Sequence, residues 1–528
     1  MATIVKQQVK GHIYLYESVS YRNENGEPRT QRKIIGKMDP NTGNPIYTEE
    51  YIQRMKENGT PVEQSSQEDT YTKNDIKRST IKEFGAFYLY KKIGEETGLL
   101  DILKDVFPRR WEQIFNIACY LVSSGDPLMY CADWVEKTEA FPNCSLSPAA
   151  ISELYKDITF AEQSEFFEKW AAYRDENEYL ALDISSVSSY SELISDVEWG
   201  YNRDREHLPQ INLCLLMGEA SGMPVFQTTY SGSIGDVSTL KSILKMAAAL
   251  PLKKLLIVMD KAFGKVKNIN SMLSDKQGVR FLVAAPFNLT FSSEAVNTER
   301  GKIDTIENTI IVGDDSVRGV TRNLHWGEKH TLSMHVYYNA LNAARIKEDL
   351  YSNVASMLDI LKQDPTNKKK AEKYNKYLEV KGNAGHDGCD IAVRHDAVDK
   401  KLRHKGWLVL IGNQPFNATD ALAVYRAKDV VEKGFYRMKN CLGLGRFRVH
   451  SSAAMQSKVF ISFIALILEC RIHRVMLVSG LYKSMTMKKL ILTLEKLRIQ
   501  HIKGKDILFP LTKVQKEIYK AFNIKEPK

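Results

Sequence analysis

The chain has 528 residues, of which 43% are hydrophobic and 26% are charged. This length exceeds what one hydrophobic core organises, and the composition excludes a wholly disordered chain, so we expect several folded domains. The seven cysteines are scattered and include no C-x-x-C pair, which excludes a disulfide framework and a zinc ribbon. The first residues lack a signal-peptide pattern, and the most apolar run, Val459 to Leu468, is too short to span a membrane. We therefore expect a cytoplasmic protein.

Positive charge is concentrated near the C-terminus. The net charge of the chain is +10, but residues 421–528 hold 22 Lys and Arg against 7 Asp and Glu, and the preceding 420 residues hold 52 against 57. Such a basic region is suited to a polyanion, because cations that neutralise phosphates release bound counterions. A solvated basic surface that keeps the protein soluble is an equally good interpretation of the charge alone.

The first part of the chain predicts a small β unit followed by helices. Residues 12–21 and 30–37 are rich in β-branched and aromatic side chains, which predicts strands within a unit spanning residues 1–62. A helical region is expected at 78–175, where Thr80-Ile-Lys-Glu83 has the pattern of a capping box ahead of an apolar helix face.

The end of that helical region contains two further helix starts. Ser147-Pro148 and the capping box Thr159-Phe-Ala-Glu162 predict two short helices. The pair matches either a DNA-binding helix-turn-helix or a plain helical hairpin, and the shortage of basic side chains favours the hairpin. Residues 78–175 therefore stay a possible DNA-binding region.

Strands and helices alternate from residue 178 to residue 287. Three strands in hairpin order are followed by two more strands that alternate with helices, which predicts a mixed sheet with helices on its faces. Residues 288–403 break this pattern and are interpreted as an insertion. The core is expected to resume at 404–450 with a strand, Gly406 to Ile411, and a helix from Asp420 to Lys439, before a basic helical region at 451–528.

Two acids each end a strongly apolar strand: Asp183 follows Tyr179-Leu-Ala-Leu, and Asp260 follows Leu255-Leu-Ile-Val-Met. If these strands are neighbours, the two carboxylates emerge side by side and repel each other unless a divalent cation lies between them. Two such cations serve in-line displacement at phosphorus, and a third acid normally completes the site. A plain alternative is that both acids cap nearby backbone N–H groups.

The candidate third acid is Glu432. Tyr425, Lys428, Glu432 and Lys439 follow one another at steps of 3, 4 and 7, which places them on one face of a helix. Such a face suits an acid that holds metal beside cations and a phenol that contact phosphates, whereas a solvated salt-bridged face is the alternative.

These residues resemble the DDE transposases of bacterial insertion sequences, in the branch whose acidic helix carries the pattern Y-x2-R-x3-E-x6-K. Asp183, Asp260 and Glu432 match the three catalytic acids, and Gly232 to Leu240 resembles the loop and helix start between the first two. Two positions differ from the pattern: Lys428 stands where the motif has arginine, and Lys261-Ala262 stands where the family usually has Arg-Gly.

The resemblance implies an α/β fold, namely an RNase H-like mixed sheet flanked by helices and interrupted by a largely β insertion. A β and helical N-terminal region and a basic helical C-terminal region complete the chain. The implied enzyme binds the ends of its own insertion sequence, cleaves DNA with two Mg²⁺ ions, for which Mn²⁺ can substitute, and joins the 3′-OH ends to target DNA. Asp183, Asp260 and Glu432 hold the metals in this interpretation, while Tyr425, Lys428 and Lys439 position the DNA.

The implied partners are double-stranded DNA, from the element's ends and the target, and a second copy of the chain in a homodimeric synaptic complex. The implied location is the bacterial cytoplasm, at the nucleoid when DNA is bound. Two rival functions stay open. One is an RNase H-fold nuclease without strand transfer, and the other is a catalytically silent DNA-binding protein derived from a transposase, against which the three intact acids argue.

Overall fold

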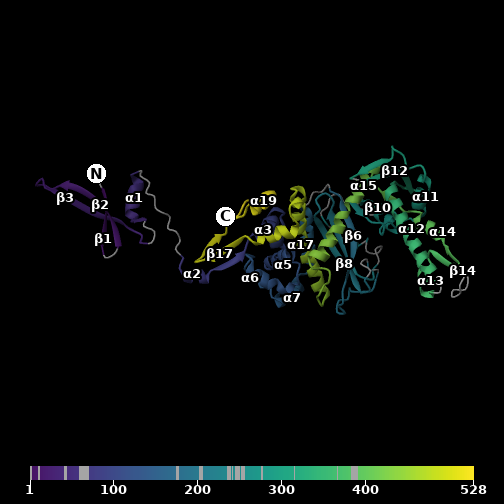
Figure 1. Cartoon of the computed structure of the whole chain (residues 1–528), viewed down its shortest axis with the longest axis horizontal. Coiled ribbons are helices and arrows are strands. Elements are labelled where there is room, and N and C mark those ends of the chain that lie inside the picture. The colour runs from purple at the N-terminus through teal and green to yellow at the C-terminus, as the bar shows by residue number, and fades with distance from the viewer. Residues whose placement is uncertain are drawn as a thin grey trace. The chain divides into compact units, whose positions relative to one another are not determined.

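The computed structural model describes residues 3–9, 12–40, 44–58, 71–173, 178–200, 202, 206–234, 240, 242–243, 250, 256–274, 278–313, 315–364, 367–381 and 390–528. The chain divides into two compact units, Met1–Thr80 with Gln500–Ile507 and Ile81–Ile499 with Leu508–Lys528. Figure 1 labels some of the helices and strands of both units.

The smaller unit is a four-stranded antiparallel sheet with a helix on one face. Its strands lie in the order β1-β2-β3-β4, and the strands expected at 12–21 and 30–37 are β2 and β3. Leu15 and Ile35 of the sheet pack with Tyr51 of the helix in a small core. The elements are β1 (Thr3–Val9), β2 (His12–Arg22), β3 (Pro28–Met38), β4 (Pro45–Tyr47), α1 (Glu49–Glu57) and α2 (Lys73–Arg78).

The larger unit is built on a nine-stranded sheet with the order β11-β12-β13-β16-β10-β9-β6-β7-β8. β6, β7 and β8 form an antiparallel meander, whereas β6, β9 and β10 run parallel. This order, with the first strand in the middle and the fourth and fifth beside it, confirms the predicted RNase H-like mixed sheet. Its strands are β6 (Leu180–Ser188), β7 (Gln210–Gly218), β8 (Pro224–Ser231), β9 (Leu256–Met259), β10 (Arg280–Ala284) and β16 (Trp407–Gly412).

Residues 288–403 differ from the expected largely β insertion. β11 (Thr309–Val312), β12 (Asp315–Trp326) and β13 (His330–Tyr338) extend the main sheet, because β13 pairs with β16. The strand edge of β16 would otherwise expose unpaired backbone groups, and the hairpin satisfies them.

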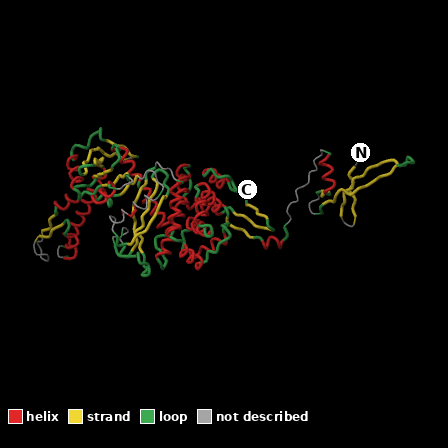
Figure 2. Tube along the Cα trace, turned by 180° about the vertical axis from the view of Figure 1, so that it is seen from behind, coloured by secondary structure: helices red, strands yellow, loops and turns green. Residues whose placement is uncertain are grey.

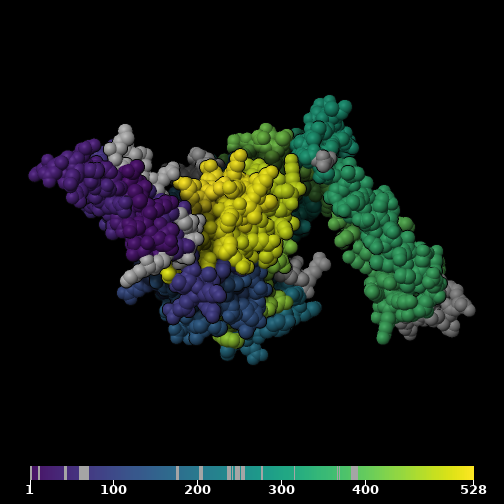
Figure 3. All heavy atoms as spheres, turned by 60° about the vertical axis from the view of Figure 1, so that its left-hand side comes forward, coloured from purple at the N-terminus to yellow at the C-terminus, as the bar shows by residue number. Residues whose placement is uncertain are grey.

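The rest of this segment is mainly helical. It forms a lobe whose core includes Leu361, Leu378 and Val398, visible in green in Figure 3. Its elements are α12 (Ala340–Gln363), α13 (Lys368–Tyr374), β14 (Leu378–Lys381), β15 (Asp390–Val393) and α14 (His395–Leu402), and α11 (Thr290–Glu299) precedes the hairpin.

The helices of the 78–175 region and the C-terminal helices form one helical body, seen in red in Figure 2. Their common core is α17, in which every side chain from Ser457 to Cys470 is buried. α17 packs on α5 and α7, and α18 packs on α3. The helices are α3 (Gly85–Glu96), α4 (Leu99–Val106), α5 (Trp111–Ser123), α6 (Cys131–Lys137), α7 (Pro148–Asp157), α8 (Phe160–Ala172), α17 (Ser452–Val478), α18 (Met487–Glu495) and α19 (Lys513–Ala521).

Two of the three predicted helix starts are present. Ser147 caps α7, and Thr159 with Glu162 forms the capping box of α8. The predicted capping box at Thr80–Glu83 is wrong, because these residues form strand β5, and the N–H groups of Phe84 and Gly85 donate to the carbonyl of Leu497.

α7 and α8 pack on other elements of the unit, α7 on α17 and α8 on α4 and β8. Phe167 of α8 packs against Phe226 of β8 with ring centroids 4.9 Å apart, and the indole N–H of Trp170 donates to the Pro224 carbonyl at 2.8 Å. α8 also carries three acids, at 162, 165 and 168, against one lysine. This charge is unsuited to a helix that reads DNA.

The remaining elements are short. They are η1 (Leu128–Tyr130), α10 (Val266–Leu273), α15 (Ala418–Ala427), α16 (Asp429–Tyr436), η2 (Arg437–Cys441), η3 (Leu481–Lys483), β17 (Arg498–Ile502) and β18 (Lys505–Leu508). Within the described residues, none of the helices combines the length and apolar character that a membrane crossing requires.

Candidate active site

Asp183 and Asp260 lie at equivalent points of two neighbouring parallel strands. β6 and β9 pair in register with Leu182 opposite Met259, and the next residue of each chain segment is the acid. β9 is apolar and fully buried, as a central parallel strand requires. β6 is apolar only before Asp183 and continues through it to Ser188, so the prediction that Asp183 ends its strand is wrong. The sequence expectation that these two acids emerge side by side agrees with the sheet register.

The turn after β9 fixes the backbone of Asp260. The N–H of Phe263 donates to the Asp260 carbonyl at 3.0 Å, and the ring of Phe263 is fully buried. The buried amide of Asn268 donates to the Phe263 carbonyl at 3.1 Å. Lys261 and Ala262 occupy this turn, so their difference from the family pattern leaves the position of the acid unchanged. Of the segment from Gly232 to Leu240, residues 235–239 lie outside the described residues.

The helix that carries Glu432 is not continuous, which corrects the prediction of one helix from Asp420 to Lys439. α15 ends at Ala427, α16 begins at Asp429, and Arg437–Cys441 is a π-helical turn. α15 packs on β9, β10, β12 and β13, whereas α16 packs on β6 and β7. The break at Lys428 lets two short helices follow different strands of one twisted sheet.

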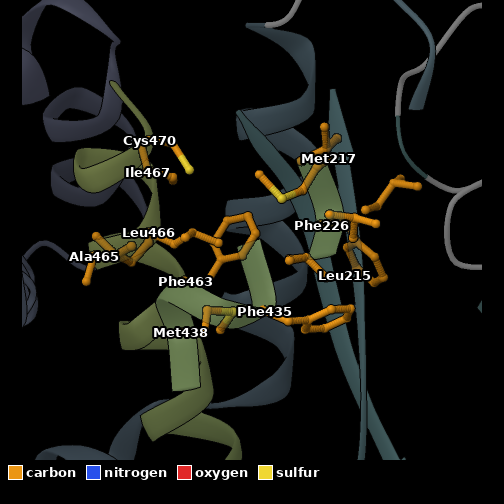
Figure 4. Packing of buried hydrophobic residues seen from close by; sticks show 14 of the residues in the cluster. Leu215, Met217, Phe226, Phe435, Met438, Phe463, Ala465, Leu466, Ile467 and Cys470 are labelled. Carbon is orange, nitrogen blue, oxygen red and sulfur yellow. The ribbon is translucent and has the colours of Figure 1, made fainter. Parts of the chain in front are cut away.

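Close packing against β7 holds α16 in place. Gly434 has no Cβ, and one built there would lie 2.3 Å from the Met217 sulfur and 2.8 Å from Leu215 Cδ2. Figure 4 shows Phe435 and Met438 between these strand residues and α17. The buried side of α16 is thus apolar, and Glu432 lies on its exposed side.

Two hydrogen bonds connect the acids to the helix break. The Tyr425 hydroxyl donates to Asp260 Oδ1 at 3.1 Å, and Lys428 Nζ donates to Glu432 Oε1 at 2.7 Å. Lys428 Nζ also lies 5.7 Å from the centroid of the Tyr425 ring. The structure therefore brings five of the six predicted site residues together.

The three acids act electrostatically on the same two side chains. Burial lowers the pKa of Lys428, but the hydrogen bond to Glu432 and the charges of Asp260, Glu432 and Asp183 outweigh it, so this pKa is raised. Burial raises the pKa of Tyr425, and the charge and hydrogen bond of Asp260 raise it further, with smaller contributions from Glu432 and Asp183. Lys428 is protonated at neutral pH and neutralises part of the acidic charge.

Lys439 lies apart from this group, in the π-helical turn. Its charge acts on Glu206, whose pKa is lowered first by hydrogen bonds from Ser188 and Arg446 and then by the charges of Arg446 and Lys439. Sequence reasoning missed Glu206 and Arg446. The available signal was the pair of arginines in Arg446-Phe-Arg448, in the basic C-terminal part of the chain.

The donor atoms at the site suit a divalent metal in kind, because carboxylate oxygens are the ligands that such ions prefer. Asp183 Oδ1 accepts from the N–H of Ile184 at 2.8 Å, while Tyr425 and Lys428 contact the other two acids. In the described part of the chain, no three His, Cys, Asp or Glu side chains are already grouped closely enough to hold an ion.

Comparisons with known proteins identify the family. Residues 176–468 match the family described as "Transposase DDE domain", and the chain therefore belongs to that family. No curated protein matches the chain. A cryo-EM structure of a piggyBac transposase synaptic complex with hairpin DNA is similar at a TM-score of 0.36 and 10% identity, over 82% of this chain and 73% of that chain.

Proposed function

We propose that the chain is a transposase that binds the ends of its own insertion sequence, cleaves the DNA there and joins the 3′-OH ends to target DNA. The observation that carries this proposal is the register of β6 and β9, in which Asp183 and Asp260 are neighbours. Glu432 is hydrogen-bonded to Lys428, and the charges of all three acids act on that lysine. The family match supports a DNA-cleaving and DNA-joining enzyme.

In this proposal Asp183, Asp260 and Glu432 hold divalent cations, with Mg²⁺ the expected ion and Mn²⁺ a substitute. Two bound ions would supply activation of the attacking oxygen and stabilisation of the leaving oxygen. The Tyr425 hydroxyl orients the Asp260 carboxylate through its hydrogen bond. Glu432 would hold an ion through its carboxylate oxygens, and the Lys428 ammonium that donates to it would donate to a DNA phosphate as well.

Cleavage and joining both require in-line displacement at phosphorus, so one such site serves both steps. Lys439, two turns beyond Glu432, is positioned for a more distant phosphate. We propose that a homodimer brings the two ends together and that the reaction takes place in the bacterial cytoplasm.

The test uses purified protein and a duplex that carries the terminal repeat flanking the coding region. Asp183→Asn, Asp260→Asn and Glu432→Gln should bind this duplex like the unmodified chain and fail to cut it in Mg²⁺. Asp429→Asn is the matched control for Glu432→Gln, because Asp429 lies on the same helix and pairs with Lys433 at the surface.

Joining is measured by transfer of the labelled end into a plasmid. Cleavage without transfer would identify the nuclease, and binding without cleavage in the unmodified chain would identify a silent DNA-binding protein. Normal cutting by Glu432→Gln would remove Glu432 from the site.

A further inference from the structure

A pocket lies beyond the C-terminal end of β6. It has a volume of about 510 Å³ and is formed by two segments, the loop after β6 and the segment before α17. The side chains that matter for its chemistry are Tyr190 and Glu192 on the first segment and Arg446, Phe447 and Arg448 on the second.

Buried groups hold the wall formed by the segment before α17. Phe447 is fully buried, and the buried Lys458 donates to the Phe447 carbonyl at 2.6 Å and to the Arg446 carbonyl at 3.3 Å. The hydroxyls of Ser195 and Ser452 lie 3.2 Å apart and connect the two segments. The pocket is therefore a built feature of the fold.

The side chains that face solvent in the pocket are of the kinds that bind a nucleotide. Tyr190 is 72% exposed, and the Arg446 guanidinium lies 5.9 Å from the centroid of its ring. Arg446 is oriented by an ion pair with Glu206 at 2.8 Å, and Arg448 supplies a second guanidinium. Glu192 is an acceptor suited to an amino group of a base.

Arg448 has an unusual backbone. Its φ of +50° lies in the left-handed region that favours glycine, so its presence costs conformational energy. An arginine at this strained position is consistent with a binding role.

The pocket lies beyond the end of the strand that carries Asp183. Ser189 is six residues beyond Asp183, and five of these steps follow strand β6, so the separation is roughly 20 Å, or about six base pairs of duplex. Lys439 lies between the two sites in the sequence, seven residues after Glu432 and seven before Arg446. Its charge acts on Glu206, which forms an ion pair with Arg446.

We propose that this pocket binds one unpaired nucleotide of the end DNA, about six base pairs from the cut. Its base stacks on Tyr190 and its phosphate contacts Arg446 and Arg448. The proposal rests on the proposed function and extends it. It assigns a second contact, which holds the DNA end while the phosphodiester at the three acids reacts. A paired base cannot reach the ring, so the nucleotide must leave the duplex, and that cost is lower at a mismatch.

The experiment measures the affinity of the full chain for end duplexes with one mismatched pair placed at successive positions from the cut. The unmodified chain should bind about 10-fold more tightly when the mismatch lies near the sixth pair. Tyr190→Ala should abolish this gain, and Tyr190→Phe should keep it, because the ring is sufficient for stacking. Tyr130→Ala, which removes a 50% exposed tyrosine elsewhere, should also keep it.

Arg448→Gly separates binding from folding. Glycine relieves the positive φ, so the melting temperature should not fall, while the dependence of log affinity on log salt should become shallower by about 0.9. A mismatch gain that is absent, or that survives Tyr190→Ala, would overturn the pocket while cleavage by the same protein persists. Failure of the unmodified chain to bind the end duplex would instead overturn the proposed function and the pocket with it.

Discussion

At the scale of single residues, the site depends on Lys428. Its side chain is 9% exposed and contacts Glu432, whose side chain is 56% exposed. Lysine fits here because one ammonium can donate to one carboxylate while its charge acts on two others. An arginine, which the family motif has at this position, would offer a planar fork suited to a bidentate contact.

Lys428→Gln should destabilise the metal-free protein by about 1–2 kcal/mol, because it removes a cation on which three carboxylates act. The folded pKa of Lys428 is raised above its unfolded value, so its contribution is complete below about pH 10 and is lost only above it. The loss should therefore be constant between about pH 6 and 9, and Mg²⁺ should restore more stability in the variant than in the unmodified chain. Thermal melts in EDTA and in Mg²⁺ measure both effects.

Lys433→Gln is the matched control for this variant. Lys433 is on the same helix and pairs with Asp429 at 2.6 Å, but both side chains are more than half exposed. Exposed pairs contribute about 0–1 kcal/mol, and this one should not respond to Mg²⁺. An equal loss of stability in Lys428→Gln and Lys433→Gln, with an equal response to Mg²⁺, would contradict the role of Lys428.

The sequence predicted the acids better than the cations. Asp260 directly follows the apolar strand β9, and Asp183 follows three apolar residues inside β6, so an apolar run before an acid is a local signal that survives folding. The position of Lys439 could not be predicted, since the π-helical turn breaks the spacing of 3.6 residues on which the shared helix face depends. Glu206 and Arg446 are 240 residues apart, and no sequence pattern connects them.

At the scale of elements, the short distance between α16 and β7 positions Glu432. Gly434→Ala should push the helix away from Met217 and Leu215, with a loss of about 1–3 kcal/mol in stability and a larger relative loss in cleavage. Met217→Val makes room and should restore part of both. Urea unfolding and single-turnover cleavage measure them, and a variant that cuts normally would show that the position of α16 does not control the site.

Glu469 on α17 makes stability depend on pH. Burial raises the pKa of Glu469 to about 7 despite the charge of Arg437, and one of its oxygens has no hydrogen-bond partner. The folded pKa lies above the unfolded value, so stability is complete below the unfolded value and falls as pH rises through about 7.

Glu469→Gln should remove this loss and leave the variant more stable than the unmodified chain at about pH 8 by up to roughly 3 kcal/mol. Glu165→Gln, at an exposed ion pair, should show no such gain. Denaturant unfolding at about pH 5 and about pH 8 provides the comparison. If the difference in free energy of unfolding between Glu469→Gln and the unmodified chain does not change with pH, Glu469 stays ionised in the folded state.

The element pattern of residues 288–403 could be predicted only in part. The break in the alternation of strands and helices is present, but the sequence cannot show that β13 pairs with β16 and not within a separate insertion. Pairing between strands is a long-range choice that alternation of side chains does not encode.

At the scale of the whole molecule, the C-terminal charge must be interpreted with the fold. Removing the chain after Ser452 would delete α17, the core of the helical body, so truncation cannot test DNA binding there. Exposed lysines can test it. Lys513, Lys516 and Lys520 lie on α19 along a groove of about 650 Å³, and Lys513 is 90% exposed.

Changing Lys513, Lys516 and Lys520 together to Gln should weaken binding to duplex DNA, because fewer phosphates are neutralised. The slope of log affinity against log salt should fall by about 0.9 for each phosphate that the variant no longer neutralises. Folding should be unaffected, because the substitutions lie on the surface.

The control for this triple variant changes three exposed lysines of the helical lobe, Lys369, Lys373 and Lys376, which have the same total charge. An equal fall in slope for both triple variants would mean that net charge alone governs affinity. An unchanged slope for the α19 variant would make this basic face a solvated surface, and DNA contacts would then have to lie along the line from Lys428 through Lys439 to Arg446.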